Sequence, residues 1–89
     1  MNKKELINEI ASKTDLTKKE IDAVLTLILE IIMDKVSLGE RVRLVGFGSF
    51  YKIPKNTNLH FVEDESIYRK LTVKFSPGKF FKQRINVRN

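Results

Sequence analysis

One long helical segment most strongly limits what this chain can fold into, because its apolar surface is unusually wide. The sequence Thr-Lys-Lys-Glu at residues 17–20 predicts a capping box at a helix start, and Gly39 predicts the helix end. Between them the apolar positions cover an arc of roughly 200°, about twice the stripe of an ordinary surface helix. The central stripe is Ile21, Val24, Leu25, Ile28, Ile32 and Val36, and Leu27, Leu29 and Ile31 widen it.

Such an arc needs cover on two sides, and a chain of 89 residues forms one small domain with few other elements to supply it. The economical solution is a second copy of the chain, which predicts a homodimer with a shared core. A heterodimer with a paralogue would meet the same need. The alternative is that the sheet predicted below covers the helix within one chain. We expect the dimer core to contain Ile21, Val24, Leu25, Ile28, Ile32, Phe47 and Phe50.

The remaining segments predict an α+β protein with the order helix, helix, three strands, helix. Asn2 and Glu5 predict a capping pair for a first helix that stops near Lys13. After the long helix the apolar period changes from helical spacing to alternation, which is typical of strands. We expect strands at residues 41–45, 46–53 and 67–75.

Three local signals refine this order. Gly46 and Gly48 indicate a bend, a bulge or the close approach of another backbone. Residues 54–66 contain several turn-forming residues and predict a connection between strands. The sequence Ser76-Pro77-Gly78-Lys79 predicts a short last helix that is capped by Ser76 and has Pro77 at its first position.

Positive charge is concentrated in the second half of the chain. The whole chain has a net charge of +6. Residues 1–39 hold six lysines and seven acidic residues, whereas residues 40–89 hold eleven basic and four acidic residues. Net charge indicates what a protein binds more than how it folds, so we interpret the positive charge as a sign of an anionic partner. The alternative is an ordinary solvated surface. We divide the domain 1–89 into a helical dimerisation half, 1–39, and a basic half, 40–89.

Catalytic and metal-binding motifs find little support. The chain has no cysteine and one histidine, which excludes disulfide frameworks, thiolate sites and multi-histidine metal sites. Residues 46–48, Gly-Phe-Gly, lack the third glycine of a dinucleotide fingerprint, and Gly78-Lys79 is not part of a phosphate-binding P-loop. His60 is predicted to be a loop residue, and residues 63–65 a solvated acidic turn. We therefore expect no enzyme activity, no cofactor and no metal.

The sequence predicts no membrane partner. The longest apolar stretch, residues 27–33, is interrupted by Glu30 and is too short to cross a bilayer. The first residues, Met-Asn-Lys-Lys-Glu, contain no apolar signal-peptide core. These observations predict a cytoplasmic protein.

Three separated segments resemble the HU/IHF family of bacterial nucleoid-associated, DNA-bending proteins. Residues 1–7, Met-Asn-Lys-Lys-Glu-Leu-Ile, resemble the start of that family. Residues 44–50, Leu-Val-Gly-Phe-Gly-Ser-Phe, match its most specific segment, and residues 75–82, Phe-Ser-Pro-Gly-Lys-Phe-Phe-Lys, resemble its last strand-to-helix junction. The resemblance implies an intertwined dimer in which two N-terminal helices precede a three-stranded antiparallel sheet. That sheet extends into a β-ribbon arm around the DNA minor groove, and a short C-terminal helix follows.

The resemblance also assigns DNA contacts by position. Lys3 would approach flanking phosphates, the backbone of residues 46–49 would lie against the phosphodiester chain, and Lys79 and Lys82 would clamp phosphates. Alternation alone places Arg41 and Arg43 on one side of a strand. The predicted DNA contacts are Lys3, Arg41, Arg43, Gly46, Gly48, Ser49, Lys52, Lys55, Arg69, Lys70, Lys74, Lys79 and Lys82.

The predicted arm departs from the family pattern at its tip. The family's Arg-Asn-Pro-x-Thr-Gly sequence, whose proline wedges between base pairs, is absent. Phe61 and Val62 stand near the middle of the arm, and either could replace that wedge, because apolar side chains can unstack a base step. The alternative is that they pack within the loop or are mobile.

The function predicted from all of these features is an architectural, largely sequence-tolerant dimer. It binds and bends double-stranded DNA, including bent, nicked or junction DNA, and compacts the nucleoid. The alternative is a protein-interaction or regulatory protein of the same fold with weakened DNA bending.

Overall fold

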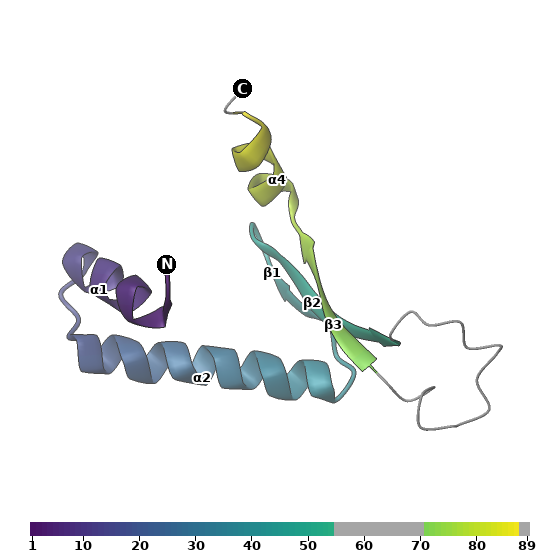
Figure 1. The fold of residues 1–89 in the computed structure, drawn as a ribbon, viewed down its shortest axis with the longest axis horizontal. Helices are drawn as coiled ribbons and strands as arrows, with labels where there is room; N and C mark the ends of the chain where they lie inside the picture. Colours follow the sequence, from purple (N-terminus) through teal and green to yellow (C-terminus); the bar gives the residue numbers. More distant parts are fainter. Residues whose placement is uncertain (55–70, 88–89) are drawn as a thin grey trace. The chain divides into compact units, whose positions relative to one another are not determined.

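The computed structural model describes residues 1–54 and 71–87 and confirms the predicted α+β order (Figure 1). The chain divides into two compact units, residues 1–33 and 34–89, so that the boundary falls inside the second helix. The elements are α1 (Lys3–Lys13), α2 (Lys18–Ser37), β1 (Val42–Leu44), β2 (Gly48–Pro54), β3 (Leu71–Pro77) and α4 (Lys79–Asn86).

Both N-terminal helices begin at capping boxes, as predicted. At α1, the backbone N–H of Glu5 donates to the Asn2 side chain at 2.8 Å, and the backbone N–H of Asn2 donates to the Glu5 carboxylate at 3.1 Å. At α2, the backbone N–H of Thr17 donates to the Glu20 carboxylate at 2.9 Å, and the N–H of Glu20 donates to the Thr17 hydroxyl at 3.1 Å. Hydrogen bonds from the backbone and then the side chain of Thr17 hold the pKa of Glu20 below its usual value.

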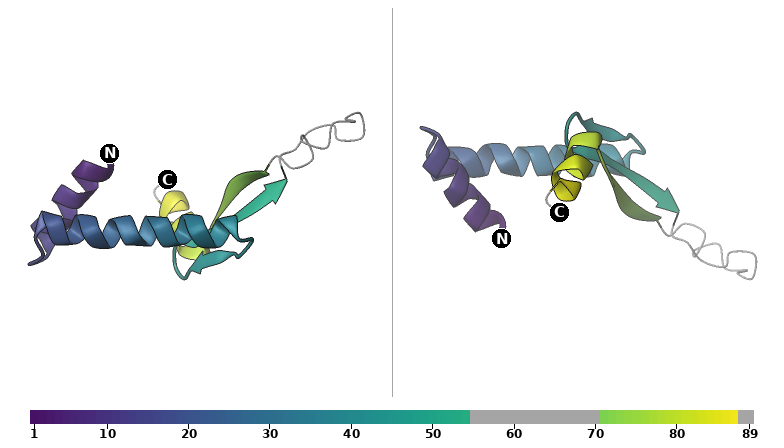
Figure 2. Two further views of the ribbon diagram at one scale, coloured as in Figure 1. Left: turned by 90° about the horizontal axis from the view of Figure 1, so that it is seen from below. Right: turned by 90° about the horizontal axis from the view of Figure 1, so that it is seen from above.

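The end of α2 is fixed by Gly39, which also confirms the prediction. Gly39 has a φ of +94°, a conformation that glycine adopts without steric cost. Its N–H donates to the carbonyl of Val36 at 3.0 Å, and the N–H of Glu40 donates to the carbonyl of Lys35 at 3.0 Å. This pair of bonds is the Schellman motif. In the views of Figure 2, α2 runs as one continuous helix up to this point.

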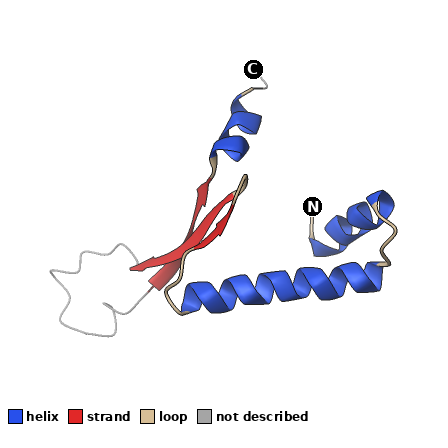
Figure 3. Cartoon of the chain, turned by 180° about the vertical axis from the view of Figure 1, so that it is seen from behind, coloured by secondary structure: helices blue, strands red, loops and turns tan. Residues whose placement is uncertain are grey.

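The three strands form one antiparallel sheet in the order β1-β2-β3 (Figure 3). Ser49 of β2 lies between Arg43 of β1 and Ser76 of β3 in the register. The prediction that residues 46–53 form a strand was wrong at its start, because residues 45–47 form the turn between β1 and β2. In that turn Gly46 has a φ of +88°, and the N–H of Phe47 donates to the carbonyl of Leu44 at 2.9 Å.

The start of the last helix also differs from the prediction. Ser76 does not cap α4, because it pairs with Ser49 in the sheet and β3 continues to Pro77. Pro77 is tolerated there because β3 is an edge strand. The N-cap is Gly78, which supplies no side-chain hydrogen bond. The described part of the third strand begins at Leu71, so the predicted residues 67–70 lie outside the described residues.

The alternation of side chains gives the sheet two chemically different faces. One face is apolar except for Lys52, and the rings of Phe50 and Phe75 lie 4.8 Å apart on it. The ring of Phe47 lies 5.1 Å from that of Phe75 and 5.3 Å from that of Phe81. The opposite face is polar and basic; it carries Arg41, Arg43, Ser49, Tyr51, Lys74 and Ser76.

Within one chain, the described residues bury few hydrophobic side chains. Among the described residues the buried hydrophobic side chains are Ile7, Ile21 and Val36. Of the residues predicted for the dimer core, Val24 is 56% exposed and Ile28 46%. Ile21 is buried, Phe47 is exposed, and Leu25, Ile32 and Phe50 are half-buried. Within the described ranges, α2 and the other helices are too short or too polar to cross a membrane.

Candidate nucleic-acid interface

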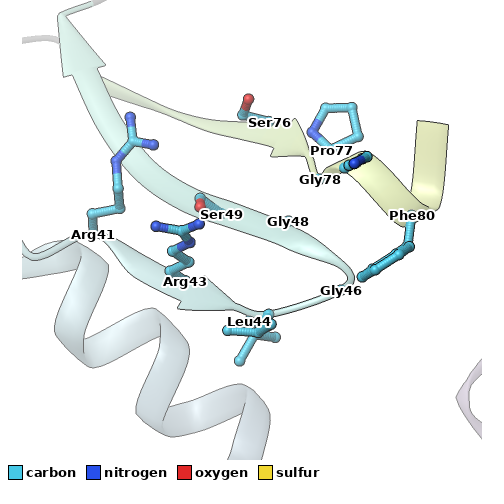
Figure 4. Close-up of a pocket in the computed structure, with 12 residues that line it drawn as sticks. Arg41, Arg43, Leu44, Gly46, Gly48, Ser49, Ser76, Pro77, Gly78 and Phe80 are labelled. Atoms are coloured by element: carbon cyan, nitrogen blue, oxygen red, sulfur yellow. The ribbon is translucent and has the colours of Figure 1, made fainter. Parts of the chain in front are cut away.

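A groove of about 320 Å³ opens where the turn between β1 and β2 meets the start of α4 (Figure 4). Its walls come from β1, the turn at residues 45–47, β2, the end of β3 and the first turn of α4. We call it the anion groove, because Arg41, Arg43 and Lys79 line it and none of its lining residues is acidic.

Strand pairing places the groups along the sheet part of the anion groove. Arg43 and Ser49 are cross-strand partners, and Ser49 is in turn the partner of Ser76. One arginine and two hydroxyl groups therefore lie side by side on the polar face (Figure 4). Arg41, two residues before Arg43, stacks on the ring of Tyr51 with its guanidinium carbon 4.1 Å from the ring centre. This cation–π contact orients the guanidinium over the same face.

Ser49 is the buried polar residue of this groove. It is only 8% exposed, and within the described chain its hydroxyl has no hydrogen-bond partner. Buried polar groups are normally hydrogen-bonded, so an unpartnered hydroxyl at the wall of a basic groove is a ready donor for a ligand oxygen.

The first turn of α4 supplies further donors. The N–H of Lys82 makes the first bond of the helix, to the carbonyl of Gly78 at 3.0 Å. The backbone N–H groups of residues 79–81 precede it and have no intrahelical acceptor. Gly78 has no side chain that could cap the helix, and its backbone N–H donates to the carbonyl of Phe47 at 2.8 Å. With Lys79 and Lys82 in the same turn, this helix start favours an anion.

Gly48 and Gly46 allow the backbone to reach this geometry. A Cβ at position 48 would lie 2.6 Å from two ring atoms of Phe75 and 2.6 Å from the carbonyl oxygen of Ser76. Only glycine fits there, because the β2–β3 pairing holds that carbonyl in place. A Cβ at position 46 would meet Phe80 at 3.7 Å, so there the positive φ is the reason for glycine.

The other predicted contacts fall into separate places. Lys74 lies on the polar face as the partner of Tyr51. The ammonium of Lys3 lies 3.2 Å from the carboxylate of Asp22 and donates to the hydroxyl of Thr26 at 2.8 Å, all within residues 1–33. Lys52 lies on the opposite face of β2 from the anion groove. The remaining sites, which lie outside the described residues, are Lys55, Arg69, Lys70, Phe61 and Val62.

Among the residues of this region that were not predicted as contacts from the sequence are Tyr51, Ser76 and Phe80. Tyr51 and Ser76 could have been found from alternation, because each is two positions from a residue of the same face. Phe80 lines the anion groove and is 61% exposed. At helical spacing a phenylalanine indicates a core position, so its place on this surface could not be read from the sequence alone.

Fold and site together define a small basic α+β protein with a sheet-and-helix surface suited to the phosphates of a nucleic-acid backbone. Comparison with known proteins supports this class. The family profile described as "Bacterial DNA-binding protein" matches residues 1–86. DNA-binding protein HU of a Nostoc species is 43% identical over 89 residues, which cover 96% of this chain and 95% of the relative.

Two solved structures are similar over almost the whole chain. A variant of HU from Thermotoga maritima has a TM-score of 0.77 and 35% identity, over 97% of this chain and 100% of that one. An Anabaena HU crystallised with DNA has a TM-score of 0.75 and 36% identity, over 97% of this chain and 98% of that one. The chain therefore belongs to the HU/IHF family of bacterial DNA-binding proteins.

Proposed function

We propose that two copies of this chain form an architectural protein that binds double-stranded DNA through its sugar–phosphate backbone and bends it. The observation that carries the proposal is the anion groove. It combines two arginines, a lysine, a buried hydroxyl that has no partner among residues 1–54 and 71–87, and the uncapped start of α4, with no acidic residue in its lining. Such groups bind the phosphates of the DNA backbone whatever the base sequence.

Each group has a distinct task in this proposal. The guanidinium of Arg43, the hydroxyl of Ser49 and the N–H groups of residues 79–81 donate to phosphate oxygens. Lys79 and Lys82 neutralise adjacent phosphates and release counterions. Phe80, exposed beside them, packs against a deoxyribose. Selectivity then comes from DNA shape and deformability, which suits bent, nicked or junction DNA.

The dimer supplies the second half of the binding surface. The apolar face of the sheet and the arc on α2 leave side chains such as Val24 and Phe47 exposed, at 56% and 44%. A second copy covers them in a shared core and adds a second groove. A net charge of +6 per chain doubles in the homodimer. In this proposal residues 1–89 form one DNA-binding domain. The protein lies on the nucleoid in the cytoplasm and catalyses no reaction.

A matched pair of charge variants tests the groove. Arg43→Met removes a predicted phosphate contact, whereas Lys35→Met removes one positive charge from the last turn of α2, outside the groove. We expect the slope of log affinity against log salt on duplex DNA to lose about 2 per dimer in Arg43→Met, since each phosphate contact contributes about 0.9. The slope for Lys35→Met should stay near that of the wild type.

Equal slopes for the two variants would contradict the groove as the binding site. Failure of the wild type to bind linear, nicked and four-way-junction DNA would overturn the proposed function itself. That second result would favour the alternative, a protein-interaction role for the same fold.

A further inference from the structure

Lys52 was predicted to contact DNA, but the structure places its ammonium elsewhere. Lys52 belongs to β2 and pairs with Val73 of β3. It alternates with Tyr51, so it lies on the face of the sheet opposite the anion groove. Its Nζ donates to the backbone carbonyl of Ser37 at 2.7 Å.

That carbonyl is the last of α2. A helix leaves its final four carbonyls without intrahelical partners. The carbonyls of Asp34 and Lys35 accept from the N–H of Leu38, each at 3.1 Å. Lys35 also accepts from Glu40, and Val36 accepts from Gly39. The carbonyl of Ser37, the next along the chain, accepts from the ammonium of Lys52. An ammonium at this position also complements the negative end of the helix dipole.

The aliphatic stem of Lys52 also has a defined position, next to the end of α2. A Cβ built on Gly39 would lie 4.0 Å from Cε of Lys52, so the stem passes close to the turn that ends α2. A small cavity of about 290 Å³ lies beside it, lined by Val36, Ser37 and Lys52 and by residues 71–73 of β3. The part of the β2–β3 pair around Lys52 and residues 71–73 is called the base of the pair here. The aliphatic stem therefore bridges the last turn of α2 and this base.

We infer that Lys52 is a positioning residue: it fixes the base of the β2–β3 pair to the C-terminal end of α2 and does not contact a phosphate. Its ammonium is engaged by a carbonyl on the far side of the sheet from Arg43 and Lys74. By this contact it sets the direction in which β2 and β3 leave the helix. This inference rests on the proposed function, because that direction determines how the strands meet bound DNA.

Three variants separate positioning from phosphate binding. Lys52→Met keeps most of the stem and removes the donor, and Lys52→Arg restores a cationic donor. Lys74→Met removes the same charge from the polar face and is the matched comparison. For each full-length variant the salt slope of duplex binding is measured. The DNA bend is measured at saturating protein by fluorescence transfer between the duplex ends, and amide hydrogen exchange is followed at Gly39 and Glu40.

We expect Lys52→Met to keep the wild-type salt slope, to show a reduced or broadened bend and to exchange faster at both amides. Lys52→Arg should restore the bend and the slow exchange. Lys74→Met should lower the slope by about 2 per dimer, with exchange unchanged. A slope loss in Lys52→Met equal to that of Lys74→Met, or an unchanged bend, would overturn the inference.

Hydrogen exchange keeps this test separate from the proposed function. If the wild type binds no DNA, the proposed function fails, yet the contact at the end of α2 is still read from the free protein. Unchanged exchange at Gly39 and Glu40 in Lys52→Met would then overturn the positioning role.

Discussion

At the scale of single residues, the anion groove depends on polar side chains whose surroundings limit their hydrogen-bond partners or their conformations. Ser49 is buried and its hydroxyl has no partner within the described chain. A ligand oxygen that accepts from this hydroxyl therefore supplies its missing hydrogen bond, which favours binding. Arg41 is held over the Tyr51 ring, which reduces the number of conformations that binding must select. The residue types could be found in the sequence, but Ser49's burial depends on strands that come together from distant segments.

Gly48 gives a residue-scale prediction. In Gly48→Ala the new methyl group would overlap Phe75 and the Ser76 carbonyl, each 2.6 Å from the position of a Cβ. Overpacking of this kind costs about 1–3 kcal/mol. Urea denaturation at one fixed protein concentration measures the loss. Gly78→Ala is the comparison, because its Cβ would meet its nearest atoms at 3.4 Å and should cost less. Equal stability of Gly48→Ala and the wild type would contradict the packing described for β2 and β3.

At the scale of elements, local rules predicted the helix boundaries well and the sheet boundaries less well. The capping boxes at Asn2 and Thr17 and the glycine at Gly39 are short-range features, and all three are confirmed. Ser76 has the same local pattern before a proline, but pairing with β2 competes for it and prevails. The role of Lys52 could not be predicted, because its acceptor lies 15 residues away in the sequence.

The capping box of α2 gives an element-scale prediction. Thr17→Ala removes the side-chain acceptor for the N–H of Glu20, and such N-cap losses cost about 1 kcal/mol. Loss of the hydroxyl should also raise the pKa of Glu20 towards its usual value, which an NMR titration of the carboxyl carbon would show. Part of the shift should remain, because the backbone N–H of residue 17 still donates to the carboxylate. An unchanged Glu20 pKa in this variant would contradict a contribution from the Thr17 hydroxyl.

The pH dependence follows from the direction of that shift. Because the folded-state pKa of Glu20 is lowered, its contribution is complete above the usual pKa of a glutamate and is lost as the pH falls through the lowered value. The wild type should therefore lose more helix stability than Glu20→Gln on acidification below the usual glutamate pKa, as followed by circular dichroism.

At the scale of the whole molecule, exposed apolar surface favours dimer formation, and positive charge favours DNA binding. A chain that buries so few hydrophobic side chains among its described residues needs a second copy to complete its core. The polar face of the sheet and the start of α4 then remain for DNA. The feature that most limits the fold, the wide apolar arc of α2, thus explains the dimer, and the charged residues lie on other surfaces that the shared core does not require.

Ile28 gives a prediction at this scale. Ile28→Lys places a charge in the middle of the arc, where the wild-type side chain is 46% exposed in one chain and covered in the proposed dimer. Burying an unpaired charge costs several kcal/mol, so dimer dissociation should become at least about 100-fold more favourable. Sedimentation equilibrium measures it. Leu38→Lys is the control, since Leu38 is 76% exposed and lies beyond the end of α2. Equal dissociation constants for the two variants would contradict the shared core.

The measurement that tests the central claim most directly is the affinity of the wild-type protein for two duplexes of unrelated sequence over a range of salt concentrations. Backbone binding through the anion grooves of a dimer predicts steep slopes of log affinity against log salt that are the same for both duplexes. A flat dependence, or tight binding to one duplex alone, would contradict it.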